Sequence, residues 1–343
     1  MSQTPLPATE DSGAVAAPPP HPFTMDGHED ALYYADAHGG PAVFDAGAPG
    51  LQLDLPGLRA GQVDASFWAI FTAGEAREPH DPEACVAAVD AMTAGYRAWL
   101  DDNPAYRLVR LAADLPDEDA AVAPGPFHVL LHCEGARGIA GLTHLQALHG
   151  QGLRSLGLTW NGANAYATGA HGDPDTGLTP AGKDLVRELN RLRMVIDGAH
   201  RNRQGLWDVL DLATAPVVVT HTACATLAPN PRNLADDQIR AVAATGGTIG
   251  IFFANIFLGP EGAPITIDTV CDHYDHLLNL VGPDHVALGT DLGGISSGVP
   301  EGLAQIGDLP ALYAALAARG WSGATLSALR GGNYRRVLSA ILG

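Results

Sequence analysis

Short runs of apolar residues alternate with amphipathic stretches along most of the chain. Each apolar run ends in polar or charged residues, a loop follows, and a helical pattern comes next. Such runs, rich in Val, Ile, Leu and Ala, are typical of parallel strands that are covered by helices. The pattern predicts eight strands, at 23–26, 63–71, 127–131, 154–159, 194–196, 217–220, 248–253 and 285–289.

The stretches between these strands have helical periodicity, and two have clear start signals. Thr179 before Pro180 is a favourable N-cap followed by proline at the first helical position. Asp236 and Asp237 place negative charge where it suits a helix dipole. The pattern predicts helices at 82–100, 180–193, 202–213, 236–245 and 268–280.

The chain length of 343 residues fits either two ordinary domains or one α/β barrel. Eight strand–helix units favour the barrel, so we expect an α/β fold, a single TIM-like (β/α)₈ domain over residues 22–343. An open, doubly wound sheet would call for a glycine-rich phosphate loop after the first strand. The sequence 25–28, Met-Asp-Gly-His, is not such a loop. Residues 1–21, rich in Ala and Pro, are expected to be a flexible leader.

Charge and composition exclude some functions. The chain has 19 Lys and Arg against 38 Asp and Glu, a formal net charge of −19, which disfavours nucleic-acid binding. It has no apolar run long enough to span a membrane, and residues 1–21 lack the pattern of a secretory signal. The four cysteines share no CxxC spacing and suggest small buried thiols. We therefore expect a cytoplasmic protein without nucleic-acid or membrane partners.

Metal-competent side chains follow five of the predicted strands. Because the carboxyl ends of barrel strands meet at one rim, these side chains are expected to converge there. Other histidines, His171 among them, are expected in loops or on helices without a role. The converging residues are His28, Asp30, Glu134, His200, His221 and Asp291.

This set of side chains predicts a metal site at the carboxyl-terminal rim of the barrel. Residues two apart in an extended segment face the same side, so His28 and Asp30 can reach one ion together. Imidazole and carboxylate ligands suit Zn²⁺ best, with Mn²⁺, Fe²⁺ and Co²⁺ as alternatives. The negative charges of Asp30, Glu134, Asp291 and a bridging hydroxide balance two divalent ions better than one, and a carboxylate such as Glu134 can bridge both.

The ordered motifs resemble the membrane (renal) dipeptidase family of the amidohydrolase superfamily. Each motif alone is weak, but their order and spacing extend from about Met25 to the segment 332–335. They are the sequences at 28–30, 134–135, 196–200, 220–222, 232–237 and 289–291.

The resemblance implies a binuclear zinc dipeptidase that hydrolyses small dipeptides through a metal-bridging hydroxide. His28 and Asp30 would bind one zinc ion, His200 and His221 the other, and Glu134 would bridge them. The resemblance also implies that Asp291 shuttles the proton and that Arg232 binds the free carboxylate of the dipeptide. A guanidinium group matches a carboxylate in a bidentate manner. Family members often form dimers, so a homodimer is a further expectation.

One position departs from the family pattern. Well-known members have a histidine in a Leu-Thr-His sequence, which contacts the substrate carbonyl, whereas this chain has Trp160 after Leu158 and Thr159. An indole donates a single hydrogen bond and does not titrate, so Trp160 is expected either to donate one bond or to wall the substrate site. Two alternatives therefore stay open. One is hydrolysis of another small carboxylated amide, such as an N-acyl amino acid or a lactam, and the other is a catalytically weak, metal-binding accessory protein.

Overall fold

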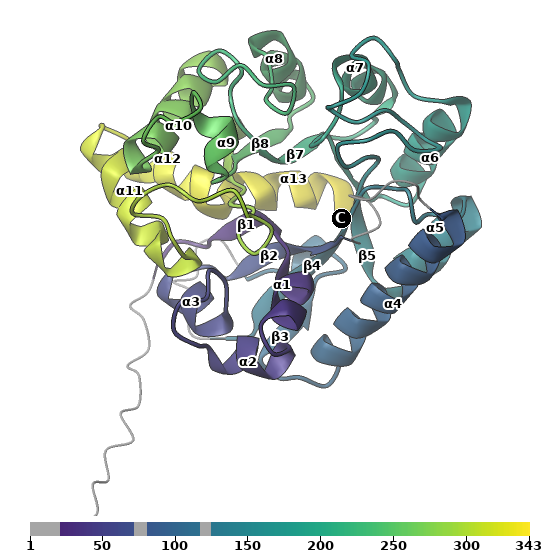
Figure 1. Ribbon diagram of the computed structural model, residues 1–343, viewed down its shortest axis with the longest axis horizontal. Coiled ribbons are helices and arrows are strands. Elements are labelled where there is room, and N and C mark those ends of the chain that lie inside the picture. The colour runs from purple at the N-terminus through teal and green to yellow at the C-terminus, as the bar shows by residue number, and fades with distance from the viewer. Residues whose placement is uncertain (1–20, 72–80, 117–124) are drawn as a thin grey trace, which may run out of the picture.

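A computed structural model describes residues 21–71, 81–116 and 125–343, and the expected leader lies outside these ranges, apart from His21. Eight parallel strands form a closed ring in the order β2-β1-β9-β8-β7-β6-β5-β4, and β4 pairs with β2 to close it. Helices surround the ring (Figure 1). The predicted single-domain (β/α)₈ barrel is confirmed.

The strands are short, as is usual for a barrel of this kind. Their bounds are β1 Met25–Glu29, β2 Ala65–Ile70, β4 Phe127–Glu134, β5 Leu153–Gly157, β6 Val195–Asp197, β7 Val218–Thr222, β8 Thr248–Ile251 and β9 Val286–Leu288. One further strand, β3 (Tyr106–Leu108), was not predicted and pairs with the beginning of β4 outside the ring.

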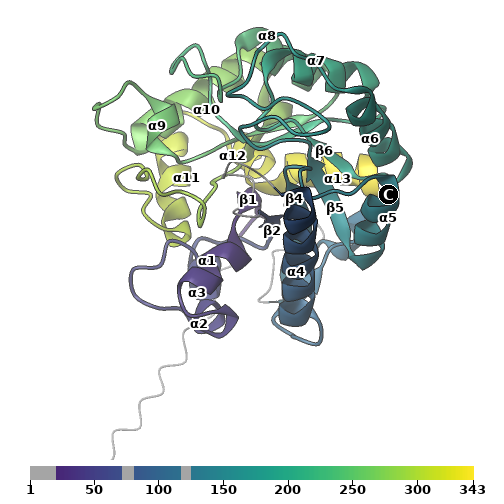
Figure 2. The ribbon, with the colours of Figure 1, turned by 45° about the vertical axis from the view of Figure 1, so that its right-hand side comes forward.

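Helices separate most of the strands, and the N-terminal helices α1, α2 and α3 gather below β1 and β2 (Figure 2). Helix α4 has the predicted bounds, and Thr179 caps α6 by accepting a hydrogen bond from the backbone N–H of Gly182. The helices are α1 Ala31–Ala37, α2 Pro41–Ala46, α3 Leu55–Ala60, α4 Pro82–Leu100, α5 Leu142–Gln151, α6 Pro180–Arg191, α7 Arg203–Leu212, α8 Asp236–Ala244, α9 Asn255–Leu258, α10 Ile267–Val281, α11 Leu309–Ala318, α12 Gly323–Ser327 and α13 Asn333–Leu342. None of the helices in the described ranges is long and apolar enough to cross a membrane; the cytoplasmic location stays a prediction.

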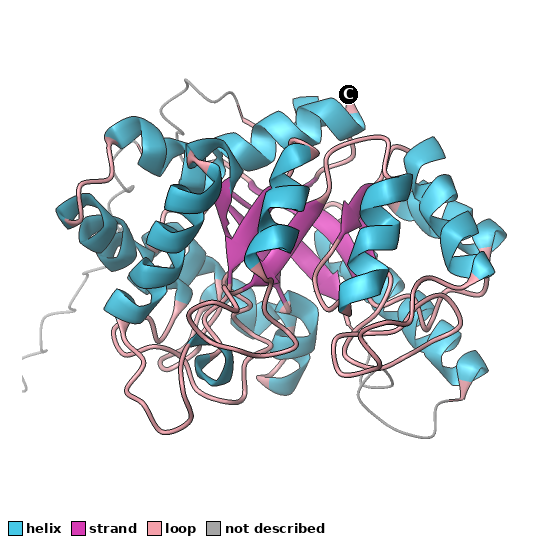
Figure 3. Cartoon of the chain, turned by 90° about the horizontal axis from the view of Figure 1, so that it is seen from above, coloured by secondary structure: helices cyan, strands magenta, loops and turns pink. Residues whose placement is uncertain are grey.

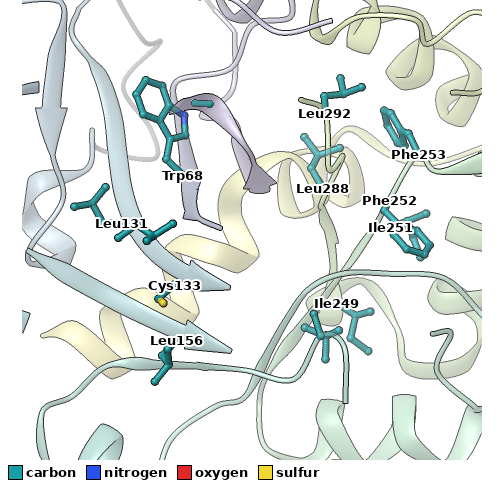
Figure 4. Close-up of a cluster of buried hydrophobic side chains, with 14 of the residues drawn as sticks. Trp68, Leu131, Cys133, Leu156, Ile249, Ile251, Phe252, Phe253, Leu288 and Leu292 are labelled. Atoms are coloured by element: carbon teal, nitrogen blue, oxygen red, sulfur yellow. The ribbon is translucent and has the colours of Figure 1, made fainter. Parts of the chain in front are cut away.

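Alternate residues of each strand face opposite sides of the barrel wall, as the period of two requires. On β4, Leu131 and Cys133 belong to the large cluster between strands and helices (Figure 4). Leu130, one residue away, belongs to a separate cluster inside the barrel. The last residue of β4, Glu134, has the parity of Leu130 and therefore faces the interior at the rim.

Helix α13 closes the amino-terminal end of the barrel. Its residues Tyr334 and Leu338 are buried in the interior cluster with Met25 and Ala65, which begin their strands. The hydroxyl of Tyr334 donates a hydrogen bond to the carbonyl of Leu288 at 2.7 Å. Figure 3 shows long loops on one side of the strands and the C-terminus on the other, so the open rim is the carboxyl-terminal one.

Candidate metal centre and substrate pocket

The carboxyl-terminal rim brings together all six metal-competent residues that the sequence indicated. His28 lies on β1 and Asp30 directly after it, Glu134 ends β4, and His221 lies on β7. His200 follows β6 and Asp291 follows β9. All six line one buried space, although they are as much as 263 positions apart along the sequence.

Irregular strand pairing directs two of the histidines. The pairing of β1 with β2 shifts register between Asp26 and Glu29, and that of β7 with β8 shifts between Val219 and Thr222. A bulge of this kind changes which side of a strand a residue faces. Val219 packs outside the barrel, and regular alternation would direct His221 outward as well. The irregularity thus explains how His28 and His221 both reach the centre of the rim.

Two residues of the site have a backbone conformation that is unfavourable for residues other than glycine. The φ angles are +59° at His200 and +63° at Asp291. Left-handed backbone at such residues is uncommon, costs on the order of 1–3 kcal/mol, and clusters at functional sites. Gly294 is also constrained, because an added Cβ would lie 2.2 Å from Oδ2 of Asp30.

The carboxylate of Glu134 lies between the three histidines. Its Oε1 atom is 2.9 Å from Nε2 of His200, 3.3 Å from Nε2 of His221 and 3.6 Å from Nε2 of His28. Asp30 and Asp291 approach from the side of His28, with oxygens 3.6 and 3.9 Å from its Nε2. The ligand atoms therefore form two overlapping groups, His28–Glu134–His221 and His28–Asp30–Asp291.

The hydrogen bonds of His200 and His221 fix where their lone pairs point. Nδ1 of His200 is 2.8 Å from Oδ1 of Asn161, which can only accept, so this nitrogen carries the proton. Nδ1 of His221 is 2.8 Å from Oγ1 of Thr220, which donates its own hydrogen to Asp197. Both neutral rings therefore present an Nε2 lone pair, and these two nitrogens are only 2.9 Å apart.

Two lone pairs at that separation repel unless a cation lies beside them. Burial lowers the pKa of both His200 and His221 well below the ordinary value, with help from the positive charge of Arg232 and His28. Within the described residues, neither ring nitrogen of His28 nor Oδ1 of Asp30 has a hydrogen-bond partner. Neutral imidazoles and carboxylates with unused lone pairs are the donors that divalent transition metals bind, so the residues fit such ions.

The remaining titratable groups show how negative the site is. Burial opposes the charge of the His28 imidazolium, but the carboxylates of Glu134, Asp30 and Asp291 outweigh it and raise its pKa to about 10. Burial raises the pKa of Glu134 well above its usual range and that of Asp291 to about 7. The site therefore attracts positive charge strongly.

Two pairs of Asp and Thr hold the backbone just before site residues. The carboxylate of Asp197 accepts hydrogen bonds from the N–H and hydroxyl of Thr220, each 2.9 Å long. Asp26 accepts in the same way from the N–H and hydroxyl of Thr290, which precedes Asp291. The sequence reasoning missed these two pairs and Asn161, because nothing in a strand pattern indicates which polar side chains support a ligand.

Arg232 is buried and lines the same pocket. Its Nη2 atom donates a hydrogen bond to the carbonyl of His221 at 3.1 Å, and its guanidinium carbon lies 5.3 Å from the centre of the Phe252 ring. Burial lowers its pKa to about 10, so it stays charged at neutral pH. Helix α8 follows Arg232 in sequence and begins with two acidic residues, but these pair with side chains other than Arg232. Asp236 pairs with His276 and Asp237 with Arg203.

The pocket over the metal-competent residues has a volume of about 330 Å³. Its floor holds Asp30, Glu134, His200 and Asp291, and Trp160 forms part of its wall. His171, expected to have no role, also lines this pocket, although its side chain is exposed. A volume at the lower end of the range for small-molecule sites suits a ligand of dipeptide size.

Comparison with known proteins identifies relatives along nearly the whole chain. The family described as membrane dipeptidase (peptidase family M19) matches residues 20–342. An uncharacterized protein encoded in the pqqA 5′ region of Klebsiella pneumoniae is 41% identical over 249 residues, covering 68% of this chain and 89% of that protein. An uncharacterized dipeptidase of Schizosaccharomyces pombe is 30% identical over 330 residues, covering 91% and 79%.

A solved structure has a similar fold. The crystal structure of a metallo peptidase from Rhodobacter sphaeroides, liganded with a phosphinate mimic of the dipeptide L-Ala-D-Ala, superposes with a TM-score of 0.82. The two sequences are 32% identical, and the superposition covers 93% of this chain and 99% of the other.

Proposed function

The chain belongs to the membrane dipeptidase family, peptidase family M19, a family of metallo-dipeptidases, and from this premise we propose that it hydrolyses dipeptides with a free C-terminal carboxylate at a site for two zinc ions. The observation that carries the proposal is the convergence of three histidines on the carboxylate of Glu134, with two imidazole lone pairs 2.9 Å apart.

The donor atoms suggest how two ions would be shared. His28 and Asp30 would hold one ion, His200 and His221 the other, and Glu134 would be a ligand of both. Divalent ions bound there would polarise the scissile carbonyl and make hydroxide available near neutral pH.

Asp291 has the position of a general acid–base group. It lies on the floor of the pocket, and in the metal-free protein burial raises its pKa to about 7. A carboxylate in this position can accept a proton from water and return it to the departing amine. A bound divalent cation would lower this pKa, so the metal-loaded protein should keep Asp291 ionised at the start of the reaction.

Arg232 would bind the carboxylate of the substrate. Its buried guanidinium faces the pocket, and within the described residues its Nε atom has no hydrogen-bond partner. An anionic group that accepts from Nε would satisfy this donor. Since Arg232 and the metal ligands line one small pocket, a substrate with many residues beyond the scissile bond would not fit.

The test measures bound metal and activity on one sample. Elemental mass spectrometry counts ions per chain, and the protein is then assayed, with and without chelator, on free dipeptides, C-terminally amidated dipeptides and N-acetyl amino acids. We expect about two zinc ions and chelator-sensitive cleavage of the free dipeptides alone. Cleavage of N-acetyl amino acids alone would favour the alternative amide substrate, and two ions without any cleavage would favour the accessory protein. Protein without tightly held metal would refute the site.

A further inference from the structure

Three aromatic side chains form a continuous wall on one side of the pocket. The ring of Phe71 lies 5.9 Å from that of Tyr33 at 80°, and 5.6 Å from that of Trp160 at 50°, measured between ring centres. All three line the pocket, and 43% of Tyr33 is exposed even though it is a large apolar residue. We name Tyr33, Phe71 and Trp160 the aromatic wall.

The barrel places Phe71, the central residue of this wall, opposite Arg232. Tyr33 lies on α1 after β1, Phe71 follows β2, and Trp160 follows β5. Phe71 and Trp160 therefore meet above the end of β4, which carries Glu134. Arg232 follows β7, and in the closed ring β7 is four strands from β2 in either direction.

The metal-competent residues lie between these two sides. On the proposed function, the carboxylate of a dipeptide binds Arg232 and its scissile carbonyl lies over Glu134. The residue on the amino side of the scissile bond then extends away from Arg232, toward Phe71 and its neighbours. The uncharged rings favour an apolar side chain at the amino-terminal residue of the dipeptide, because packing against them removes apolar surface from water.

We propose that the aromatic wall is a specificity site for the amino-terminal residue of the dipeptide and that it selects large apolar or aromatic side chains. The inference rests on the proposed function and adds the substrate class. The wall adjoins the metal-competent residues, since the centre of the Trp160 ring lies 6.0 Å from that of the His200 imidazole. A side chain packed on the wall therefore stays close to the scissile bond, where positioning affects the rate.

The side of the pocket near Arg232 offers a matched control. Phe257 stacks on Phe252 with ring centres 5.0 Å apart, and Phe252 in turn lies under the guanidinium of Arg232. Phe257 also lines the pocket. Replacing Phe257 by alanine removes a ring of the same size as Phe71 from the carboxylate side, and so separates loss of the wall from general loss of apolar surface.

The experiment measures kcat/KM for Gly-Ala, Leu-Ala, Phe-Ala, Ala-Gly and Ala-Phe with the metal-loaded 343-residue protein and three variants. For the parent we expect Phe-Ala to exceed Gly-Ala by at least about 10-fold, the scale of selectivity that apolar pockets provide. Phe71→Ala should reduce this ratio by about 10-fold. Tyr33→Ala should reduce it by only about 3-fold, because Tyr33 is the more exposed of the two side chains. Phe257→Ala should leave the ratio unchanged and instead alter the ratio of Ala-Phe to Ala-Gly.

Each failure has a distinct meaning. If the parent cleaves Gly-Ala and Phe-Ala equally well, or if Phe71→Ala keeps the parental ratio while folding normally, the aromatic wall is not a specificity site and the dipeptidase assignment stands. The inference would also be overturned if the ratio of Phe-Ala to Gly-Ala fell as much in Phe257→Ala as in Phe71→Ala. If none of the dipeptides is cleaved by the parent, the proposed function fails and this inference fails with it.

Discussion

Replacing Thr220 by valine should weaken metal binding without changing the shape of the barrel. The Thr220 hydroxyl is buried, accepts the Nδ1 proton of His221 at 2.8 Å and donates to Asp197 at 2.9 Å. Valine has the shape of threonine but cannot form either bond. His221 then loses the partner that fixes its tautomer, so its Nε2 lone pair is no longer held toward Glu134.

The size of the effect follows from this geometry. Loss of a hydrogen-bonding partner behind a metal-binding histidine typically lowers metal affinity by about 10- to 100-fold, which corresponds to about 1.4–2.8 kcal/mol. Oδ2 of Asp197 would also lose its hydrogen-bond donor and keep only Nε2 of His132 at 3.5 Å, which should lower the free energy of unfolding by about 1–3 kcal/mol. Thr220→Ser is the matched control, because it keeps the hydroxyl and removes only a methyl group.

Competition with a chelator of known affinity measures this effect. Metal-free protein is titrated with Zn²⁺ in the presence of the chelator, for the parent and both variants, and chemical denaturation gives their stabilities. We expect a weaker zinc dissociation constant in Thr220→Val and a near-parental one in Thr220→Ser. Parental affinity in the valine variant, or an equal loss in the serine variant, would refute the role given to the hydroxyl.

Four further outcomes test the site and the fold. Asp291→Asn should retain both metal ions by elemental mass spectrometry and lose about 10²- to 10⁴-fold in kcat, and full activity would contradict its role in proton transfer. Arg232→Ala should raise KM for free dipeptides, and a parent protein that cleaved amidated dipeptides equally well would rule out the carboxylate contact. Chelation should lower the melting temperature, because each ion held at 100-fold above its dissociation constant stabilises the fold by about 2.7 kcal/mol, so an unchanged temperature would argue against bound metal. Burial raises the pKa of Asp64 to about 6. Because the folded state then binds the proton more tightly than the unfolded state, stability should fall as pH rises from about 4 to 6, by up to about 3 kcal/mol, and denaturation curves of Asp64→Asn should lack that component.

The sequence predicted the barrel because its signals are local and repeated. Apolar runs between helices mark the eight strands of the ring, and α4 begins and ends where its pattern does. The short β3 was missed because Tyr106–Leu108 has only three residues, too few to show a period. The rim residues were found because the carboxyl ends of parallel strands meet, a rule that needs no knowledge of side-chain direction.

Side-chain direction is what the sequence could not supply. Regular alternation would send His221 outward with Val219, and only the shift in register of β7 reverses this. Asn161 and Thr220 each hold one histidine ring by a hydrogen bond to its Nδ1 atom. The sequence does not reveal these bonds, because His200 is distant from Asn161 along the chain and His221 lies on a bulged strand. His171 reaches the pocket through a loop whose path no periodic pattern describes.

Charge balance favours two ions over one in this pocket. Asp30, Glu134 and Asp291 carry three negative charges when ionised, and a hydroxide adds a fourth, while Arg232 and the carboxylate of a dipeptide offset each other. With neutral histidines, one divalent ion would leave a net charge of about −2 inside a buried space, which is costly. Two divalent ions would balance the four negative charges. Without metal the same imbalance raises the pKa of His28 to about 10, because a proton is then the cation that the carboxylates attract.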